Sequence, residues 1–427
     1  MKEKVYLCID LKSFYASVEC VERGLDPMTT NLVVADPTRS DKTICLAVSP
    51  ALKALGVRNR CRVFEIPKTI EYIMAPPRLQ KYIDYSAEIY GVYLNYISKD
   101  DIYIYSIDEC FIDVTDYLKL YGKTPREMAQ FLMNEITGRV GVRATCGIGT
   151  NLYLAKVALD ITAKHSPDFI GELDELSYRE KLWDHRPITD FWRVGSGTAK
   201  RLAKYGIYTM GDITDADEDL MYKVFGIDAE LLIDHAWGIE PTEIKDIKEY
   251  RPKTNSISRG QVLMRDYKFE EGRIIVKEMM ELIALEMVQK NVVTESVTLQ
   301  VGYSNKLEAE PAHGTMGFDF PTNAGSLMVE KISELYDRIM DEDLPIRRVF
   351  ITCNNIKEKT EEKQLNFFET ALEEDLKREN DMQQAINSIK HKFGKNAMFK
   401  AMDLEEAATT LERNLQIGGH KSGNEKK

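Results

Sequence analysis

The chain has 427 residues, 44% of them hydrophobic and 30% charged, and its formal net charge is −12. This length predicts two to four domains rather than one. No apolar run approaches roughly 18 residues, so no membrane contact is expected, and the N-terminus does not have the pattern of a signal peptide. Seven cysteines without a C-x-x-C spacing argue against structural zinc and predict a cytoplasmic location, where thiols stay reduced.

Three carboxylates follow predicted strands. The apolar run at residues 5–9 ends at Asp10, and a run at 102–105, rich in β-branched and aromatic residues, precedes Asp108 and Glu109. Carboxylates in a turn are poor core residues but good ligands for hard divalent cations. A lone Asp-Glu pair is more often a solvated turn, but three carboxylates on neighbouring strands can hold two Mg²⁺ ions roughly 3.5–4 Å apart.

Residues 19–80 interrupt the alternation of strands and helices expected at 1–18 and 81–172. Within them, residues 38–71 carry seven Lys or Arg against three Asp or Glu, which is a local charge of +4 in an acidic chain. Polyanion binding needs such a local positive surface rather than a positive total. A solvated loop with uneven charge is the competing interpretation.

Residues 173–245 are predicted to be helical with intervening glycines. Within them, the sequence from 194 to 202, VGSGTAKRL, is typical of a helix-hairpin-helix. Gly195 and Gly197 permit a tight turn, the amides at the next helix start can meet a phosphate oxygen, and Lys200 adds positive charge. An ordinary αα-hairpin would give a similar pattern.

The region after a polar linker at 246–250 has the β-α-β-β-α-β order of a split βαβ sheet. Its cations are candidates for phosphate contacts across the sheet face, although any single one is equally well a surface charge. These candidates are Arg251, Lys253, Arg259, Arg347 and Arg348. In the charged tail, 369–393 is predicted to be an amphipathic helix and the end from 417 onward to be disordered.

The sequence around the carboxylates resembles the Y-family (lesion-bypass) DNA polymerases. DLKSFYASVE at 10–19 and SIDE at 106–109 are similar to the two acidic motifs of this family. The resemblance continues through 51–57, 147–151 and 154–164 and covers about the first 245 residues. The chain is UmuC/DinB-like and is most similar to the UvrX-type proteins of Gram-positive bacteria.

This resemblance implies an α/β (α+β) fold of the right-hand polymerase type, divided as follows. The palm comprises 1–18 and 81–172, the fingers 19–80, the helix-hairpin-helix thumb 173–245, the linker 246–250, the split-βαβ little finger 251–356, and the charged tail 357–427.

The activity that the resemblance implies is template-directed, error-prone translesion synthesis in DNA repair and the SOS response. A primer 3′ hydroxyl attacks a deoxynucleoside triphosphate with the help of two Mg²⁺ ions. By the resemblance, Asp10 and Asp108 bridge both ions, Glu109 completes the ion at the primer end, and the backbone carbonyl of Leu11 is a further ligand. No exonuclease-like set of carboxylates is visible, so no proofreading is expected.

The nucleotide contacts implied are Lys53 and Lys164 for the triphosphate and Tyr15 as the steric gate. An aromatic ring under the sugar rejects ribonucleotides by a clash with the 2′-hydroxyl. The chain departs from the family at one point: many members have Tyr-x-x-Arg where this chain has Pro50 and Lys53. A hydroxyl is therefore missing, and a bidentate guanidinium is replaced by a point charge.

The tail contains QLNFF, which resembles a bacterial sliding-clamp-binding peptide through Gln364, Leu365, Phe367 and Phe368. A hydrophobic staple onto the little finger is the competing interpretation. The partners implied are primer–template DNA, deoxynucleoside triphosphates, the sliding clamp (β subunit) and accessory damage-tolerance proteins.

Two other functions stay open. A diguanylate-cyclase-like palm protein would explain the carboxylates but not the helix-hairpin-helix or the clamp-like peptide. For a catalytically weak DNA- and clamp-binding regulator, Pro50 leaves some room, whereas the intact Asp10, Asp108 and Glu109 argue against it.

Overall fold

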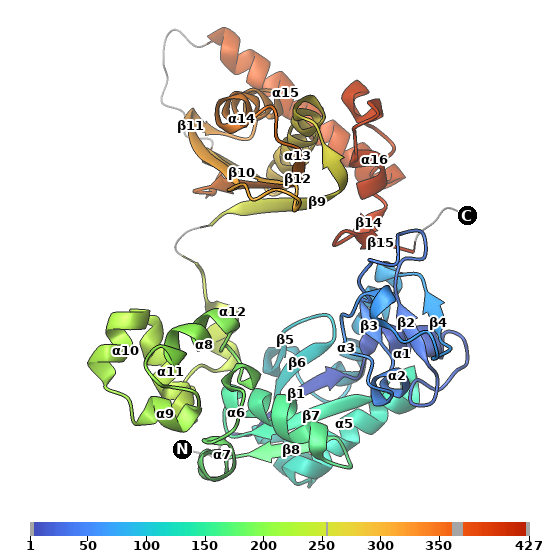
Figure 1. Ribbon diagram of the computed structural model, residues 1–427, viewed down its shortest axis with the longest axis vertical. Coiled ribbons are helices and arrows are strands. Elements are labelled where there is room, and N and C mark those ends of the chain that lie inside the picture. The colour runs from blue at the N-terminus through green and yellow to red at the C-terminus, as the bar shows by residue number, and fades with distance from the viewer. Residues whose placement is uncertain (1–3, 253–254, 361–369, 424–427) are drawn as a thin grey trace. The chain divides into compact units, whose positions relative to one another are not determined.

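The computed structural model describes residues 4–252, 255–360 and 370–423 (Figure 1). These residues form two compact units, one of residues 4–250 with 421–423 and the other of residues between 251 and 420. Among them, no helix is both long and apolar enough to cross a membrane.

A five-stranded sheet with the order β5-β6-β1-β7-β8 forms the centre of the first unit. Its strands are β1 (Tyr6–Leu11), β5 (Ile102–Ile104), β6 (Glu109–Asp113), β7 (Ala144–Gly149) and β8 (Ile170–Leu173). The central strand β1 pairs antiparallel with both β6 and β7. Because β1 is apolar up to Asp10, it is almost completely buried, and Asp10 is the one charged residue of this strand.

Helices accompany this sheet: α3 (Leu79–Leu94), α4 (Thr115–Tyr121), α5 (Pro125–Val140) and α6 (Leu152–Val157), which continues into the turn Ala158–Thr162. Two glycines of β7 allow α6 to pack closely. A Cβ atom at Gly147 would lie 2.0 Å from the carbonyl oxygen of Ala155, and one at Gly149 would lie 2.1 Å from the amide nitrogen of Ala155. These glycines therefore serve helix–strand packing.

A smaller three-stranded sheet, in the order β3-β2-β4, belongs to the same unit. It consists of β2 (Leu32–Val34), β3 (Ala47–Val48) and β4 (Ile73–Ala75), with α1 (Phe14–Val21) and α2 (Pro50–Ala54) beside it. The side chain of Ser49 caps α2 by accepting a hydrogen bond from Leu52 N, and Pro50 occupies the first turn. Proline is favoured there because its missing N–H has no helical partner.

Short helices complete the first unit: α7 (Glu175–Leu182), α8 (Ser196–Ala203), α9 (Met210–Thr214), α10 (Glu218–Phe225), α11 (Asp228–Trp237) and α12 (Ile244–Glu249) (Figure 1). The predicted polar linker at 246–250 is wrong for most of its length, because α12 continues to Glu249. Ile244 is buried in a cluster with Tyr6 and Leu152, and this burial stabilises the helix against its polar composition.

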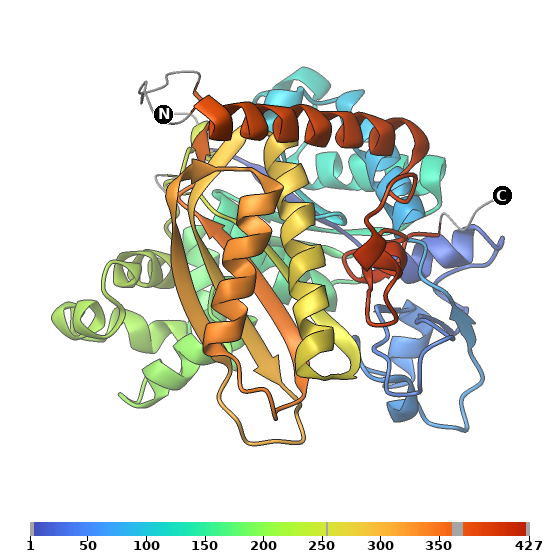
Figure 2. The ribbon, with the colours of Figure 1, turned by 90° about the horizontal axis from the view of Figure 1, so that it is seen from above.

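The second unit has the predicted β-α-β-β-α-β order. Its elements are β9 (Ile257–Tyr267), α13 (Phe269–Gln289), β10 (Val292–Tyr303), β11 (Ala312–Thr322), α14 (Gly325–Ile339) and β12 (Ile346–Asn354). The sheet order is β11-β10-β12-β9. Figure 2 shows α13 and α14 side by side over one face of this sheet, where their apolar side chains form one buried core.

The tail contains β13 (Lys357–Glu358), α15 (Thr370–Phe393), α16 (Thr410–Arg413), β14 (Gln416–Ile417) and β15 (His420–Lys421). The amphipathic helix predicted at 369–393 corresponds to α15, which packs against α13. The prediction of disorder from 417 is wrong for residues 417–423. Lys421 forms an ion pair of 3.3 Å with Asp36, and the carbonyl oxygen of Ser422 accepts a hydrogen bond of 2.9 Å from Gln80 N.

Candidate active site

The three predicted carboxylates meet at one end of the five-stranded sheet. Asp10 on β1 lies directly opposite Glu109 on β6. Asp108 immediately precedes β6, and its carbonyl oxygen accepts a hydrogen bond of 2.9 Å from Leu11 N. Strand pairing thus brings Asp10 and Leu11 next to a second pair of residues about 100 positions further along the sequence, Asp108 and Glu109.

The electrostatics show how crowded these carboxylates are. Burial, followed by repulsion from Asp108 and Glu109, raises the pKa of Asp10 to about 7. Burial also raises the pKa of Glu109. Such crowding of negative charge favours a bound cation, and carboxylate and carbonyl oxygens are the donors that Mg²⁺ prefers. The donor set therefore fits a hard divalent ion.

The carboxylates are held by the protein's own groups. Ser106 Oγ donates a hydrogen bond of 2.6 Å to Asp108, and Lys156 Nζ lies 3.0 Å from Glu109 Oε1. Within the part of the chain that the structure describes, no three His, Cys, Asp or Glu side chains already form a ligand set for a metal ion. Metal binding would thus require side-chain adjustment around Asp108 and Glu109.

Lys156 is a site residue that the sequence analysis did not assign. Its side chain is almost fully buried, and it pairs with Asp160 at 2.9 Å as well as with Glu109. Burial alone would lower the pKa of this ammonium group, but the neighbouring negative groups raise it above its ordinary value, so it stays charged. The i, i+4 spacing of Lys156 and Asp160 was visible in the sequence, but the contact of Lys156 with Glu109 was not.

Tyr15 lies beside this site on α1. The neighbouring Phe14 is buried in the core, whereas Tyr15 is partly exposed. Burial and the nearby Asp108 carboxylate raise the pKa of Tyr15. The ring of Tyr15 stacks on that of Tyr82, with 4.3 Å between centroids and 15° between planes.

The predicted triphosphate cations lie near the same carboxylates. Partial burial lowers the pKa of Lys53, while the charges of Asp10 and Lys164 act on it in opposite directions, which places all three groups in one electrostatic neighbourhood. Lys12 belongs to it too, because the charges of Lys53 and Arg143 contribute to lowering its pKa after burial. Lys12 and Arg143 are thus cations that the sequence analysis missed.

Comparisons with known proteins agree with this geometry. The impB/mucB/samB family model matches residues 9–160, and the model of the C-terminal domain of that family matches residues 254–367. UvrX of Bacillus subtilis (strain 168), named for UV-damage repair, is 32% identical over 98% of this chain and 98% of its own length. DNA polymerase IV 2 of the same strain is 30% identical over 98% of this chain and 99% of its own length. The chain belongs to the Y-family of DNA polymerases.

The Y-family fold is also found among solved structures. A Y-family DNA polymerase chimera of Dbh and Dpo4 superposes with a TM-score of 0.64 at 21% identity, covering 83% of this chain and 99% of the chimera. The predicted mixed α/β polymerase fold with a little-finger domain is therefore confirmed.

The glycines of the predicted helix-hairpin-helix lie at the start of α8. Gly195 is the N-cap residue of this helix, and a Cβ atom at Gly195 or Gly197 would meet nothing within 4 Å. Lys200 is exposed on the same helix. The space around this helix start is therefore open to a ligand, although neither glycine is required by packing.

The little-finger arginines are divided between the two faces of the sheet. On β9, Arg259 and the buried Leu263 point to the same side of the strand, which α13 covers. Arg259 pairs with Glu286 of α13. Its guanidinium is thus already paired within the domain, and the phosphate contact expected for Arg259 stays a prediction.

The remaining candidates differ in their surroundings. Arg347 lies 3.6 Å from Asp266, whereas the exposed Arg348 donates a hydrogen bond of 2.9 Å to the neutral Asn305. Arg251 is exposed, and Lys253 lies outside the described residues. The clamp-like residues Gln364, Leu365, Phe367 and Phe368 also lie outside them.

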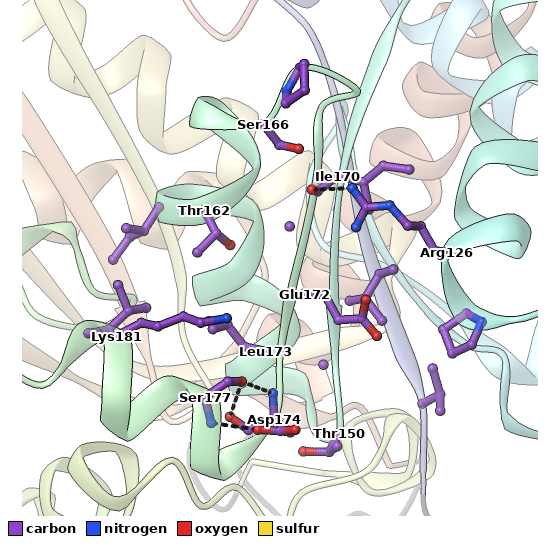
Figure 3. A pocket seen from close by; sticks show the side chains of 18 residues that line it. Arg126, Thr150, Thr162, Ser166, Ile170, Glu172, Leu173, Asp174, Ser177 and Lys181 are labelled. Carbon is purple, nitrogen blue, oxygen red and sulfur yellow. Dashed lines mark hydrogen bonds between the residues drawn. The ribbon is translucent and has the colours of Figure 1, made fainter.

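A cavity of about 980 Å³ borders the edge strand β8 of the five-stranded sheet along its whole length (Figure 3). It borders Gly149 and Thr150, where β7 ends, and the figure shows Arg126 and Lys181 on different sides of it. None of the predicted site residues lines it. The candidate active site is therefore the carboxylate end of the sheet rather than this cavity.

Proposed function

We propose that the chain is a template-directed, error-prone DNA polymerase that extends primers past damaged bases. The observation that carries this proposal is the pairing of Asp10 with Glu109, with Asp108 beside them and Tyr15 next to the same carboxylates. Family membership supports DNA and nucleotide binding and the use of a divalent metal.

The proposed chemistry is nucleotidyl transfer. Asp10, Asp108, Glu109 and the carbonyl of Leu11 would hold two Mg²⁺ ions, which supply Lewis acidity to the primer hydroxyl and the triphosphate. The protein itself contributes position and charge. Lys53 and Lys164 attract the triphosphate, and the ring of Tyr15 under the sugar excludes a 2′-hydroxyl.

The DNA contacts proposed are of two kinds. At the thumb, the open start of α8 with Gly195 and Gly197 would meet a backbone phosphate, with Lys200 beside it. At the little finger, Arg348 is the strongest candidate because its partner in the structure is neutral, so its charge stays available to a phosphate. Arg251 and Lys253 complete this proposal.

Clamp binding is a further part of the proposal. An extended segment with two apolar anchors and a glutamine can fill a hydrophobic pocket on the sliding clamp. Phe367→Ala should then abolish stimulation of synthesis by the clamp, and Phe399→Ala, at an exposed phenylalanine elsewhere in the tail, should leave stimulation intact. Stimulation that survives Phe367→Ala would overturn this assignment. Work in the SOS response beside accessory damage-tolerance proteins is proposed on the same family basis.

The decisive experiment is primer extension with Mg²⁺ on undamaged and abasic templates, with and without sliding clamp. Asp108→Ala should abolish extension while the protein still binds primer–template DNA. Asp100→Asn removes an exposed carboxylate close by in the sequence and should not affect extension. Extension that survives in Asp108→Ala would refute the proposed active site.

A second candidate function is a catalytically weak DNA- and clamp-binding regulator. It is favoured by Pro50, which begins α2 where many family members have a tyrosine hydroxyl for the nucleotide. DNA binding by the intact protein without extension on any template would support this function over the first.

A further inference from the structure

A fully buried carboxylate lies one helical turn beyond Tyr15. Glu19 follows Tyr15 by four positions on α1, and its side chain has no exposed surface. Arg78 binds both of its oxygens, from Nε to Oε1 at 2.9 Å and from Nη2 to Oε2 at 2.8 Å. Arg23 also donates to Glu19 Oε2. Such a bidentate pair fixes the orientation of a carboxylate.

The same carboxylate holds the ring that backs Tyr15. The hydroxyl of Tyr82, on α3, donates a hydrogen bond of 2.7 Å to Glu19 Oε1. Tyr82 is itself fully buried, and its ring stacks on that of Tyr15. Burial alone would raise the pKa of Glu19, but the hydrogen bonds from Arg78, Arg23 and Tyr82 lower it below its ordinary value, so the carboxylate is ionised.

A steric gate excludes a 2′-hydroxyl only if the gate ring cannot move away. Tyr15 is partly exposed and makes its stacked ring contact with Tyr82, so the freedom of Tyr15 depends on what holds Tyr82. Buried, fully satisfied polar networks hold one arrangement, because any displacement leaves a desolvated charge without its partners.

We propose that Glu19 is a positioning residue for sugar selection, which acts through Tyr82 to keep the gate ring of Tyr15 in place. This inference rests on the proposed function, in which Tyr15 is the gate. It assigns sugar discrimination to a carboxylate that touches neither the nucleotide nor the gate ring directly.

The chain offers a matched control for each change. Three positions further along α1 and α3, Tyr85 donates a hydrogen bond of 2.8 Å to Glu22, which also lies 3.5 Å from Arg78. This second pair is also a tyrosine hydroxyl on a glutamate and shares Arg78, but Glu22 is partly exposed and pairs more closely with Lys81, at 2.8 Å. Among the described residues, however, no ring contact joins Tyr85 to Tyr15.

The test measures kcat/KM for a deoxynucleotide and for the ribonucleotide of the same base in Tyr82→Phe and Tyr85→Phe. Loss of the hydroxyl at Tyr82 should lower the deoxy-to-ribo ratio by roughly 10- to 20-fold, the lower end of the effect of one hydrogen bond to a charged group. Tyr85→Phe should leave the ratio unchanged. Equal ratios in the two variants, at a temperature where both are folded, would overturn the inference.

Two further variants separate the possible failures. Tyr15→Ala should lower the ratio more than Tyr82→Phe; if it does not lower the ratio at all, the gate assignment in the proposed function fails. Glu19→Gln, compared with Glu22→Gln, should lower the ratio at least as much as Tyr82→Phe does. Glu19→Gln leaves Arg78 and Arg23 with a neutral partner, so its ratio is interpreted only if the variant folds. If it does not fold, the ratio of Tyr82→Phe decides whether the inference holds.

Discussion

The first unit, which holds the carboxylate cluster of Asp10, Asp108 and Glu109, and the little finger differ in the surroundings of their predicted charged residues. In the first unit, strand pairing brings together like charges that are distant in the sequence, and burial followed by their repulsion raises the pKa of Asp10 to about 7. In the little finger, Arg259 is already paired with Glu286 and Arg347 lies near Asp266.

This difference shows which sequence signals indicate function. Carboxylates that end two neighbouring strands are forced together by strand pairing, and a bound cation would relieve their repulsion. A basic residue that is predicted to bind DNA only because it is charged is usually paired with an acidic residue of its own domain. A cluster of like charges with too little opposite charge around it is therefore a stronger indication of a functional site than a surface charge in an ion pair.

Among the residues that the sequence analysis did not assign, the largest effect is expected at Lys156, a buried lysine that contacts the carboxylate cluster. Lys156→Met removes the ammonium from Glu109 Oε1 while keeping the length of the side chain. Since small misplacements at a reacting centre cost up to about 10²-fold, kcat should fall by roughly 10- to 100-fold. The measurement is single-nucleotide incorporation over a range of Mg²⁺ concentrations.

The control for this prediction is Lys119→Met, at an exposed lysine on α4. Lys156→Arg should retain more activity than Lys156→Met, since it keeps a charge near Glu109. If high Mg²⁺ restores Lys156→Met completely, Lys156 acts on metal affinity rather than on the orientation of Glu109.

The same cluster shows what the sequence could predict. The carboxylates and the little-finger topology were predictable because strand-end acids and β-α-β-β-α-β periodicity are local patterns. The contact of Lys156 with Glu109 was not, because it depends on how α6 packs over β7 and β1, and that close approach depends on Gly147 and Gly149 of β7.

The errors have physical causes as well. The polar composition of 246–250 indicated a linker, but Ile244 finds an apolar cluster against which α12 can form. The glycine-rich end at 417–423 indicated disorder, but Lys421 finds the carboxylate of Asp36. In both places tertiary contacts override a local preference that is worth only about 1 kcal/mol per residue.

An intermediate effect is expected from the little-finger arginines, and it sharpens the comparison of the two units. Arg348→Ala should weaken primer–template binding roughly 3- to 10-fold and reduce the slope of log K against log salt by about 1, because one phosphate contact is lost. Arg259→Ala should change neither quantity, since Arg259 is engaged by Glu286. Binding titrations at several salt concentrations test both. Equal salt slopes for the two variants would mean that Arg348 and Arg259 contribute equally to phosphate binding, whichever face of the sheet they lie on.

The smallest effect is expected at a buried pair remote from the catalytic carboxylates, which tests whether a paired charge contributes only stability. Glu240 Oε2 lies 3.1 Å from His235 Nε2, and Glu240 Oε1 accepts a hydrogen bond of 2.9 Å from Thr242 N. Burial alone would raise the pKa of Glu240, but these partners lower it from 4.5 to about 2.

A pKa that is lower in the folded state stabilises the protein above pH 4.5, and this stability is lost as pH falls toward 2. Glu240→Gln has no such titration. The free energy of unfolding should therefore differ more between wild type and Glu240→Gln at pH 6 than at pH 3, by about 2 kcal/mol. Denaturant unfolding at the two pH values measures this difference, and primer extension by Glu240→Gln at neutral pH should stay close to wild type. If wild type and Glu240→Gln differ in unfolding free energy by the same amount at both pH values, Glu240 is not held ionised by its partners. A large loss of primer extension in Glu240→Gln would mean that this pair does more than stabilise the fold.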